Sequence, residues 1–478
     1  MNIYLGNCFS RVEGTPKEER FLSRILSFKV PGYQYTRAFR RHYWDGTKKL
    51  FNKNSSTYPT GLTPAVLLAA KKKKFDINLI PRRRRPRIAK FRKVKLKHST
   101  LRDYQSQAIR AALYNRLNGV TWPRGVFEHA TGSGKTILAS GVIYALSVPT
   151  LYLVQRLDLL HQTHEVLERE LGIEIGLWGG GKFDLQKVTI GMIQSVTAAL
   201  DDKSVKKYLS GIDLLIMDEC HHVGNSNTYY DIAKITNAYY RFGFSGTALR
   251  RKDLGDVYLI GALGEVLHTV KPKELVERGL LARPTIHIHE VTEPVIPKYS
   301  IWNDVYQQGV VLNVERNRKV VAETMKSVQE GRSTLILVRI LEHGRQLKRL
   351  FLNEGMDVVF LQGVVEPESR KYHLKRFRDG KNKLLIASTI FDEGIDIPQI
   401  GTLIIASAGE SEIKTIQRLG RSLRPKPGEN KVTVVDFLDR THKFLLKHSL
   451  NRIRVYQQEE FDVQLPEKVS QRTKARSR

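Results

Sequence analysis

Cysteine is scarce in this chain of 478 residues, which contains only Cys8 and Cys220. Two cysteines provide no disulfide framework, which argues against a small secreted scaffold and fits a reducing cytoplasm. Long apolar runs are absent too, and none approaches the roughly 18 residues that a membrane span requires. The opening MNIYLGNCFSRVEG lacks the charged and then apolar layout of a signal peptide. We therefore expect a cytoplasmic protein with no membrane partner.

Acidic residues are outnumbered, with 48 Asp and Glu against 79 Lys and Arg and a formal charge of +31. Such an excess attracts a polyanion, and nucleic acid is the first candidate. The excess is concentrated in residues 71–97, where fourteen Lys or Arg accompany a single acid, Asp76. Contact with a phosphate backbone is the favoured interpretation of this block. A solvated linker, a nuclear localisation signal and a membrane-surface patch are the alternatives.

Apolar runs alternate with helical segments in two long stretches of the chain, residues 96–290 and residues 291–450, the second of which opens with a proline-spaced linker. This alternation predicts an α/β fold with two tandem parallel sheets, each covered by helices on both faces. For residues 1–95 we expect a small basic α+β domain, and for residues 451–478 we expect a basic tail. The expected strands are residues 150–154, 188–192, 214–217, 240–244, 335–338, 358–361, 384–387, 403–406 and 432–437.

A glycine-rich turn, ATGSGKT, occupies residues 130–136 between an apolar run and a helical run. Backbone N–H groups in such a turn cradle phosphates at a helix N-terminus. Lys135 would neutralise the outer phosphates and the Thr136 hydroxyl would bind Mg²⁺. His129 replaces the first glycine of the full pattern, and glycine-rich turns alone are common. The expected nucleotide-binding residues of the turn are Thr131, Gly132, Ser133, Gly134, Lys135 and Thr136.

A second motif, LLIMDECHH, spans residues 214–222 and places two carboxylates at the end of a buried strand. Asp218 would hold Mg²⁺ and Glu219 would polarise the attacking water. An ordinary polar strand end and a zinc site built on Cys220 are the alternatives, but adjacent strand residues point to opposite faces and Cys8 is the only other cysteine. The two motifs in this order predict hydrolysis of a nucleoside triphosphate with Mg²⁺.

The segment QRLGRSLRP, residues 417–425, places Arg421 and Arg424 three residues apart, so that one helical face presents both. Arginines supplied to a γ-phosphate stabilise the transition state of its transfer. Gln417 would position water or sense the phosphate. The alternative is a surface helix with salt bridges, although no acid lies between Gln417 and Pro427.

Aromatic and basic residues are interleaved near the N-terminus, in residues 32–51. Asp45 and Gly46 predict a hairpin turn. Arg40, Arg41, Trp44 and Lys48 are expected to contact nucleic acid, since aromatic rings stack on bases and cations pair with phosphates. Burial of Trp44 in the core of the small domain is an equal alternative.

Eight segments in order resemble the motifs of superfamily 2 helicases, whose fold is two RecA-like domains. LRDYQ, residues 101–105, resembles the adenine-reading segment, which gives Arg102 and Gln105 a role in nucleotide binding. ATGSGKT, DECH, the SGT of residues 245–247 and QRLGRSLR resemble motifs I, II, III and VI. The remaining matches imply nucleic-acid contacts for Arg156, Gln194, Ser195 and Thr389, and ribose contacts for Gly394 and Asp396. Ala248 and Gln417 depart from the pattern of many RNA helicases.

The flanks of the chain resemble a narrower group, the UvsW-like recombination helicases of bacteriophages, in residues 32–62, 242–246, 264–266 and 448–463. The resemblance implies ATP-dependent remodelling of branched DNA: branch migration of Holliday junctions, fork regression and dissociation of displacement loops in recombination, repair and replication. It also implies the host cytoplasm if a phage encodes the chain, a monomer, and recombination or replication proteins as partners. A double-strand translocase that does not unwind and an RNA helicase are the alternatives. ATP-independent annealing remains open.

Overall fold

The computed structural model describes residues 1–83, 85–86, 91–223, 228–249, 254–362, 367–388, 400–409 and 431–466. The chain divides into two compact units. The first contains residues 1–129 and 134–270, and the second contains residues 130–133 and the chain from Lys271 onward. No helix in the described ranges is long and apolar enough to cross a membrane.

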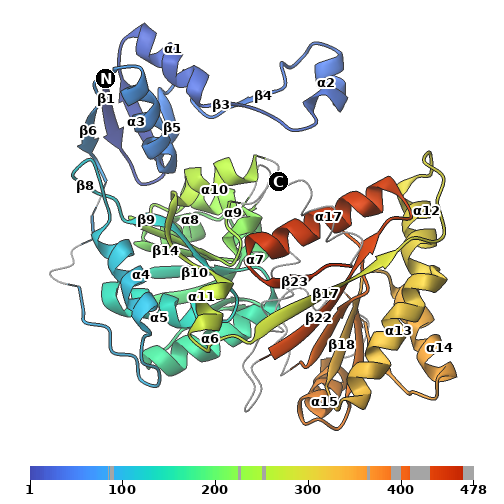
Figure 1. The fold of residues 1–478 in the computed structure, drawn as a ribbon. Coiled ribbons are helices and arrows are strands. Elements are labelled where there is room, and N and C mark those ends of the chain that lie inside the picture. The colour runs from blue at the N-terminus through green and yellow to red at the C-terminus, as the bar shows by residue number, and fades with distance from the viewer. Residues whose placement is uncertain are drawn as a thin grey trace. The chain divides into compact units, whose positions relative to one another are not determined.

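The first unit begins with a small four-stranded sheet in the order β5-β2-β1-β6 (Figure 1). Strand β1 pairs antiparallel with β2 and parallel with β6. Leu22 of α1 and Val66 of α3 are buried with Ile3, Leu5 and Val12 of the sheet, which gives this part an apolar core of its own. The elements are β1 Asn2–Leu5, β2 Phe9–Glu13, α1 Pro16–Ile25, β5 Thr57–Pro59, η2 Thr60–Leu62, α3 Thr63–Lys72 and β6 Asn78–Pro81.

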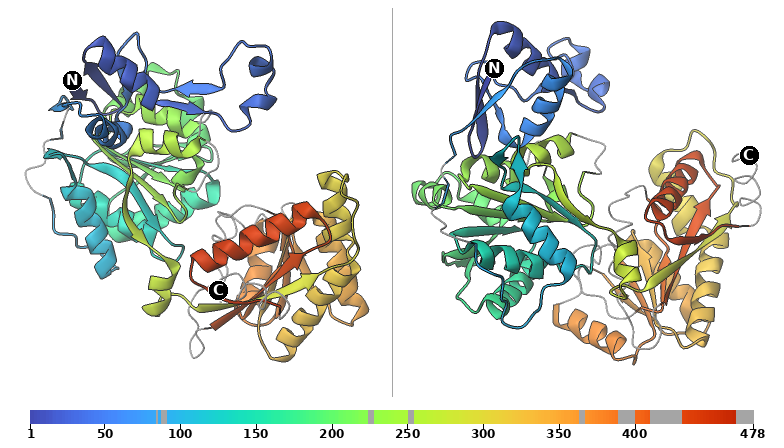
Figure 2. Two further views of the ribbon diagram at one scale, coloured as in Figure 1. Left: turned by 45° about the horizontal axis from the view of Figure 1, so that its top comes forward. Right: turned by 60° about the vertical axis from the view of Figure 1, so that its left-hand side comes forward.

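An arm, residues 27–49, extends from this sheet (Figures 1 and 2). Its elements are β3 Ser27–Lys29, η1 Tyr33–Tyr35, α2 Arg37–Arg40 and β4 Thr47–Lys49. The prediction that Asp45 and Gly46 form a hairpin turn between two strands is wrong. Strands β3 and β4 pair antiparallel, but residues 30–46 join them, and Asp45 and Gly46 form only the turn that enters β4.

The large sheet of the first unit has eight strands in the order β12-β11-β13-β10-β14-β15-β9-β16. All neighbouring strands are parallel except β11 and β12. The strands are β9 Arg124–His129, β10 Thr150–Val154, β11 Gly176–Gly179, β12 Lys182–Phe183, β13 Val188–Met192, β14 Leu214–Asp218, β15 Tyr240–Ser245 and β16 Val266–Val270; β7 Arg116–Leu117 and β8 Val120–Thr121 form a separate short pair.

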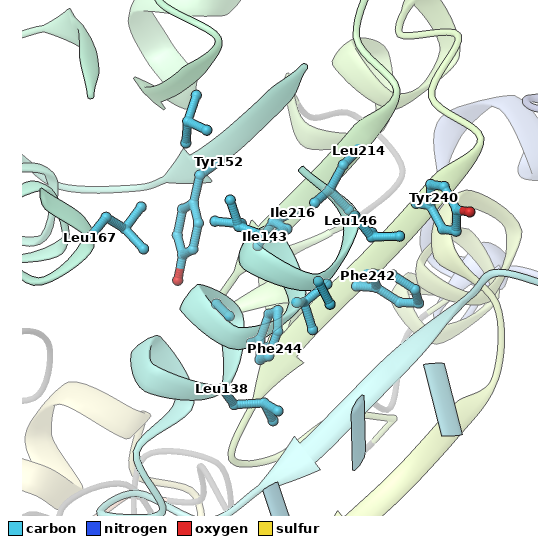
Figure 3. Close-up of a cluster of buried hydrophobic side chains, with 14 of the residues drawn as sticks. Leu138, Ile143, Leu146, Tyr152, Leu167, Leu214, Ile216, Tyr240, Phe242 and Phe244 are labelled. Atoms are coloured by element: carbon cyan, nitrogen blue, oxygen red, sulfur yellow. The ribbon is translucent and has the colours of Figure 1, made fainter. Parts of the chain in front are cut away.

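Helices cover both faces of this sheet, because alternate residues of its buried strands point to opposite sides. Ile216 and Phe244 pack with Leu138 and other residues of the α4, α5 and α6 side (Figure 3). Leu215 and Met217 pack with the helices α7 to α10. The helices are α4 Asp103–Tyr114, α5 Lys135–Leu146, α6 Leu157–Leu171, α7 Ile193–Ala198, α8 Lys203–Ser210, α9 Thr228–Ile235 and α10 Gly255–Leu263.

The small sheet is joined to the amino end of the large sheet by polar contacts. The buried Arg241 donates to backbone carbonyls at the end of α9 and lies 2.9 Å from Cys8 Sγ. The buried Arg124 donates to the carbonyl of Asn7. Gly61 is required here, because a Cβ at this position would lie 1.9 Å from a backbone oxygen of α10. The N-terminal part is therefore fixed on the sheet that carries the glycine-rich turn.

The second unit contains a seven-stranded sheet in the order β19-β20-β18-β21-β22-β17-β23, parallel throughout. Val320 of α13 and Leu347 of α14 pack on one face of this sheet, and α17 contacts β22 and β23. The strands are β17 Arg283–Val291, β18 Thr334–Val338, β19 Val359–Leu361, β20 Leu384–Ser388, β21 Thr402–Ile405, β22 Lys431–Asp439 and β23 Asp462–Gln464. The helices are α11 Pro272–Glu277, α12 Trp302–Tyr306, α13 Val314–Gln329, α14 Leu341–Asn353, α15 Pro367–Arg378 and α17 Lys443–Gln458. A short π-helix, η4 Gln307–Val311, follows α12.

The predicted α/β class with two parallel sheets is confirmed. All nine strands expected from the sequence are present, and their ends lie within two residues of the predicted ones. Their buried apolar runs gave a clear signal, because strands covered on both faces are apolar at every position.

Candidate nucleotide site at the carboxyl edge of the first large sheet

The glycine-rich turn connects the carboxyl end of β9 to the start of α5. Gly132 has φ 89° and Gly134 has φ 78°, values that favour glycine. A Cβ on Gly134 would lie 2.8 Å from Gln105 Nε2, so this position is also closely packed. The turn therefore ends in the free N–H groups of the first turn of α5, the arrangement that binds phosphate.

Lys135 and Thr136 are the first two residues of α5, and both are half-buried. The Lys135 ammonium donates to the carbonyl of His129 at 3.5 Å. Thr131 and Ser133 lie within the turn, and Ser133 donates its backbone N–H to Ala130 at 3.1 Å. All six sequence-predicted residues of the turn thus lie together at one helix N-terminus.

Gln105 is buried on α4 and contacts the turn directly. Its Nε2 donates to the carbonyl of Gly134 at 3.2 Å, and its Oε1 accepts from the backbone N–H of Arg102 at 2.9 Å. The Arg102 guanidinium donates to the Tyr104 hydroxyl at 2.8 Å. Gln105, the expected base-reading residue, and Arg102 therefore lie at the start of one helix that abuts the glycine-rich turn.

The two predicted carboxylates follow β14 at the same edge of the sheet. Burial, and next the neighbouring Glu219 carboxylate, raise the pKa of Asp218 to about 6. Glu219 has φ 44° and ψ 46°, a left-handed conformation that is uncommon for a residue other than glycine. Non-glycine residues in this region cluster at functional sites, where the surrounding structure holds them.

Motif II is linked to motif III by a buried hydroxyl. The Ser245 hydroxyl lies 3.0 Å from His221 Nδ1 and accepts the backbone N–H of Thr247 at 3.1 Å. His221 Nδ1 also lies 3.3 Å from Glu219 Oε2. A chain of contacts thus runs from the Glu219 carboxylate to the end of β15.

The zinc alternative at Cys220 receives no support from the geometry. The Cys220 side chain is buried toward Gly243, where an added Cβ would lie 2.7 Å from its sulfur. In the part of the chain that the structure describes, no group of three His, Cys, Asp or Glu could hold a metal ion. For Mg²⁺, one hydroxyl and one carboxylate from Thr136 and Asp218 are a suitable protein contribution, because this ion keeps several waters and substrate phosphates as ligands.

Three predicted nucleic-acid residues follow neighbouring strands at the same edge. Arg156 precedes α6 after β10, while Gln194 and Ser195 lie in α7 after β13. Gln194 Nε2 donates to the carbonyl of Gln155 at 3.2 Å, which connects the two segments.

A loop that was not predicted from the sequence, Gly179 to Phe183, lies beside these residues. Gly179, Gly180 and Gly181 all have positive φ. A Cβ on Gly179 would lie 2.8 Å from the Met192 side chain, and one on Gly180 would lie 2.5 Å from Leu157, so the loop lies close to both strand-end segments. Three consecutive glycines at the end of an apolar run were the available signal.

The predicted contacts of the arm differ in exposure. Arg40, Arg41 and Lys48 are exposed, whereas Trp44 is half-buried and its indole N–H donates to the carbonyl of Thr47 at 2.7 Å. In the basic block of residues 71–97, Arg83 is folded onto the protein, with its guanidinium 5.4 Å from the Trp122 ring centre and 5.1 Å from that of Tyr239.

The remaining predicted site residues lie outside the described residues. These are Thr389, Gly394, Asp396, Gln417, Arg421 and Arg424.

Two family models match the chain in the order of its two large sheets. Residues 98–250 match the type III restriction enzyme res subunit, and residues 315–426 match the helicase conserved C-terminal domain. The chain is a superfamily 2 helicase. Its two parallel-sheet domains are RecA-like, and it is an ATP-hydrolysing enzyme.

Relatives of this helicase extend over most of its length. The ATP-dependent DNA helicase UvsW of Enterobacteria phage T4 is 24% identical in an alignment that covers 95% of this chain and 97% of that protein. The DNA 3'-5' translocase XPB2 of Sulfurisphaera tokodaii is 26% identical and covers 69% of this chain and 80% of its own length. The structure of S. cerevisiae Dbp5 bound to RNA and ADP BeF3 has a TM-score of 0.52 at 18% identity, covering 76% of this chain and 88% of that one, a similarity of fold alone.

Proposed function

We propose that this helicase uses ATP to remodel branched DNA, by branch migration of Holliday junctions, regression of forks and dissociation of displacement loops. The supporting observation is the length of the similarity to UvsW. It covers 95% of this chain and therefore includes the N-terminal part, which lies outside the two matched family models. In the structure this part carries an exposed basic arm, which suits contact with a nucleic-acid backbone.

At the nucleotide site, we assign phosphate binding to the backbone of residues 131–134 and to Lys135. Thr136 and Asp218 would hold Mg²⁺, whose positive charge offsets the negative charge of the phosphate oxygens. Glu219 would accept a hydrogen bond from the attacking water and orient it toward the γ-phosphate. Arg102 and Gln105 would bind the adenine base.

The assignments in the second RecA-like domain rest on the resemblance of its motifs. Gln417, Arg421 and Arg424 would act at the γ-phosphate, Gly394 and Asp396 at the ribose, and Thr389 at the DNA backbone.

The strand-end loops would grip DNA through its backbone. Arg156, Gln194, Ser195 and the N–H groups of the triple-glycine loop, Gly179 to Gly181, are all suited to phosphate oxygens. Contacts of this kind do not read sequence, so stepping along the strand would be independent of sequence.

A labelled four-way junction tests the proposal. With ATP, we expect the wild-type helicase to convert the junction into two duplexes, and we expect no conversion without ATP or with Lys135→Ala. ATP hydrolysis without any conversion of junctions or forks would contradict the proposal.

A double-strand translocase that does not unwind is the second candidate, favoured by the similarity to XPB2, whose name describes a translocase. Displacement of a third strand from a DNA triplex would detect such movement. Triplex displacement together with intact junctions would favour the translocase, and equal stimulation of ATP hydrolysis by RNA would favour an RNA helicase.

A further inference from the structure

The arm, residues 27–49, extends away from the small sheet (Figure 1). Its own side chains brace it. The Tyr33 ring packs edge-on against Phe39 at 4.7 Å between ring centres, and Lys29 Nζ lies 4.8 Å from the centre of the Tyr33 ring. Gly46 is buried beneath Tyr33, where a Cβ would lie 2.3 Å from the ring. The arm therefore has a defined shape, which positions the side chains on its outer surface.

The end of α2 turns Tyr43 toward solvent. His42 has φ 58°, the left-handed conformation that commonly ends a helix, and Tyr43 donates its backbone N–H to the carbonyl of Ala38 at 2.9 Å. The Tyr43 side chain is 82% exposed, whereas the neighbouring Trp44 is half-buried and hydrogen-bonded. The backbone is thus fixed while the ring is free.

Positive charge surrounds Tyr43 on the arm. Arg37, Arg40 and Arg41 are exposed, and within the described ranges their guanidinium groups make no hydrogen bond or ion pair. The only acid of the arm, Asp45, accepts two hydrogen bonds from Thr47, at 2.9 Å from its backbone N–H and 2.5 Å from its hydroxyl. Both bonds are to Oδ1 and hold the carboxylate in the turn, and within the described ranges no ion pair joins it to the three arginines, which remain available to an external anion.

A free aromatic face among unpaired arginines matches nucleic acid in which a base is unstacked. Aromatic rings stack on bases of any sequence, and cations pair with the adjoining phosphates. Inside a continuous duplex both faces of each base are covered by neighbouring pairs. Only a branch point, an end or a single strand offers an open base.

We propose that Tyr43 stacks on the open face of a base at the branch point of DNA, while Arg40 and Arg41 hold the flanking phosphates. This inference rests on the proposed function and adds to it the residue that distinguishes branched from continuous DNA. Tyr35, which is 72% exposed on the same arm, would be a second stacking platform.

The test compares the affinity of the full-length protein for a four-way junction with its affinity for a linear duplex of the same length, in the absence of ATP. Tyr43→Ala should weaken junction binding roughly tenfold more than duplex binding, since loss of one base stack costs on that order. Tyr43→Phe should retain the wild-type preference, because it keeps the ring. Arg41→Ala should weaken the junction and duplex complexes alike, because a contact with a phosphate does not depend on whether the neighbouring base is stacked. Tyr299→Ala is the control, an exposed tyrosine in the second unit with 90% exposure.

A second readout follows the base itself. With 2-aminopurine at the branch point, binding of wild type or Tyr43→Phe should quench its fluorescence, and binding of Tyr43→Ala should not. An unchanged junction preference in Tyr43→Ala, or equal quenching by all variants, would overturn the inference and leave the proposed function intact. A wild-type protein that binds junction and duplex equally and converts no junction would overturn both.

Discussion

At the scale of single residues, Glu219 and its neighbours would determine the chemistry proposed for the nucleotide site. Its left-handed backbone carries the carboxylate past the end of β14. His221 and Ser245 then connect that carboxylate to motif III. A change at Ser245 should therefore affect hydrolysis without affecting nucleotide binding.

Ser245→Ala removes the hydroxyl that bonds to His221 and accepts from Thr247. Loss of about 1 kcal/mol of hydrogen bonding should lower kcat for ATP roughly fivefold, with KM unchanged. Steady-state phosphate release measures both constants. Ser210→Ala is the control, because its hydroxyl bonds only within α8, to the carbonyl of Lys207. A wild-type kcat in Ser245→Ala would show that the link has no part in hydrolysis.

Lys135→Ala removes the only side-chain ammonium of the glycine-rich turn, residues 130–136. We expect ATP hydrolysis to fall by about 10²- to 10³-fold, the usual effect of losing one preorganised charge at a reacting group. DNA binding, measured by anisotropy, should persist, because the arm and the basic block lie elsewhere in the chain. Normal hydrolysis in this variant would refute the assignment of the turn.

Motif residues were predictable from the sequence, but the use of individual aromatic and basic residues was not. Trp44 and Tyr43 are adjacent and chemically similar, and only the turn at His42 decides which ring faces solvent. Arg83 belongs to an apparently uniform basic block, yet it packs between Trp122 and Tyr239. The first choice depends on the backbone conformation of a single residue, and the second on contacts between residues that are distant in the sequence.

At the level of elements, the arm depends on one close contact. Gly46 has φ 76° and no space for a Cβ beside Tyr33, whereas Gly32 has φ 74° and its nearest neighbouring atom lies 3.9 Å away. Alanine at either position incurs the backbone cost of about 1 kcal/mol, but only Gly46→Ala also displaces the Tyr33 ring. Gly46→Ala should therefore weaken junction binding several-fold more than Gly32→Ala in the anisotropy assay. Equal binding by the two variants would contradict the rigid arm.

The parallel sheets were predictable because their strands are apolar at successive positions. The N-terminal arm was not, because its short strands lie 17 residues apart and its expected hairpin turn lies at the entry to β4. The polar attachment of the small sheet was also hidden, since Arg124 bonds to the carbonyl of Asn7 and Arg241 to Cys8 Sγ, contacts that no apolar pattern reveals.

For the whole molecule, two buried histidines predict sensitivity to acid. Burial is the main cause that lowers the pKa of His129 to about 3, with His268 and Lys135 adding to it, and burial also lowers that of His343 to about 3. Unfolding restores a pKa near 6.5, so the unfolded chain takes up protons as the pH falls below that value and the folded chain does not. Each histidine should therefore remove about 2 kcal/mol of stability between pH 7 and pH 5.

Thermal unfolding at pH 5, 6 and 7 measures this loss. His343→Gln keeps a donor for Asn317 Oδ1, which lies 2.9 Å from His343 Nε2, but cannot take up a proton. Its stability should decrease less steeply with falling pH than that of the wild type. An identical slope would show that His343 is not a source of the acid sensitivity.

On the proposed function, ATP hydrolysis at the first large sheet serves the remodelling of branched DNA. The rate of ATP hydrolysis by the wild-type protein, measured with single-stranded DNA, linear duplex, a four-way junction and RNA of matched length, tests this proposal. We predict the strongest stimulation by the junction and its resolution into duplexes in the same reaction. Equal stimulation of ATP hydrolysis by plain duplex, with every junction strand still paired with its original partner, would contradict the proposal.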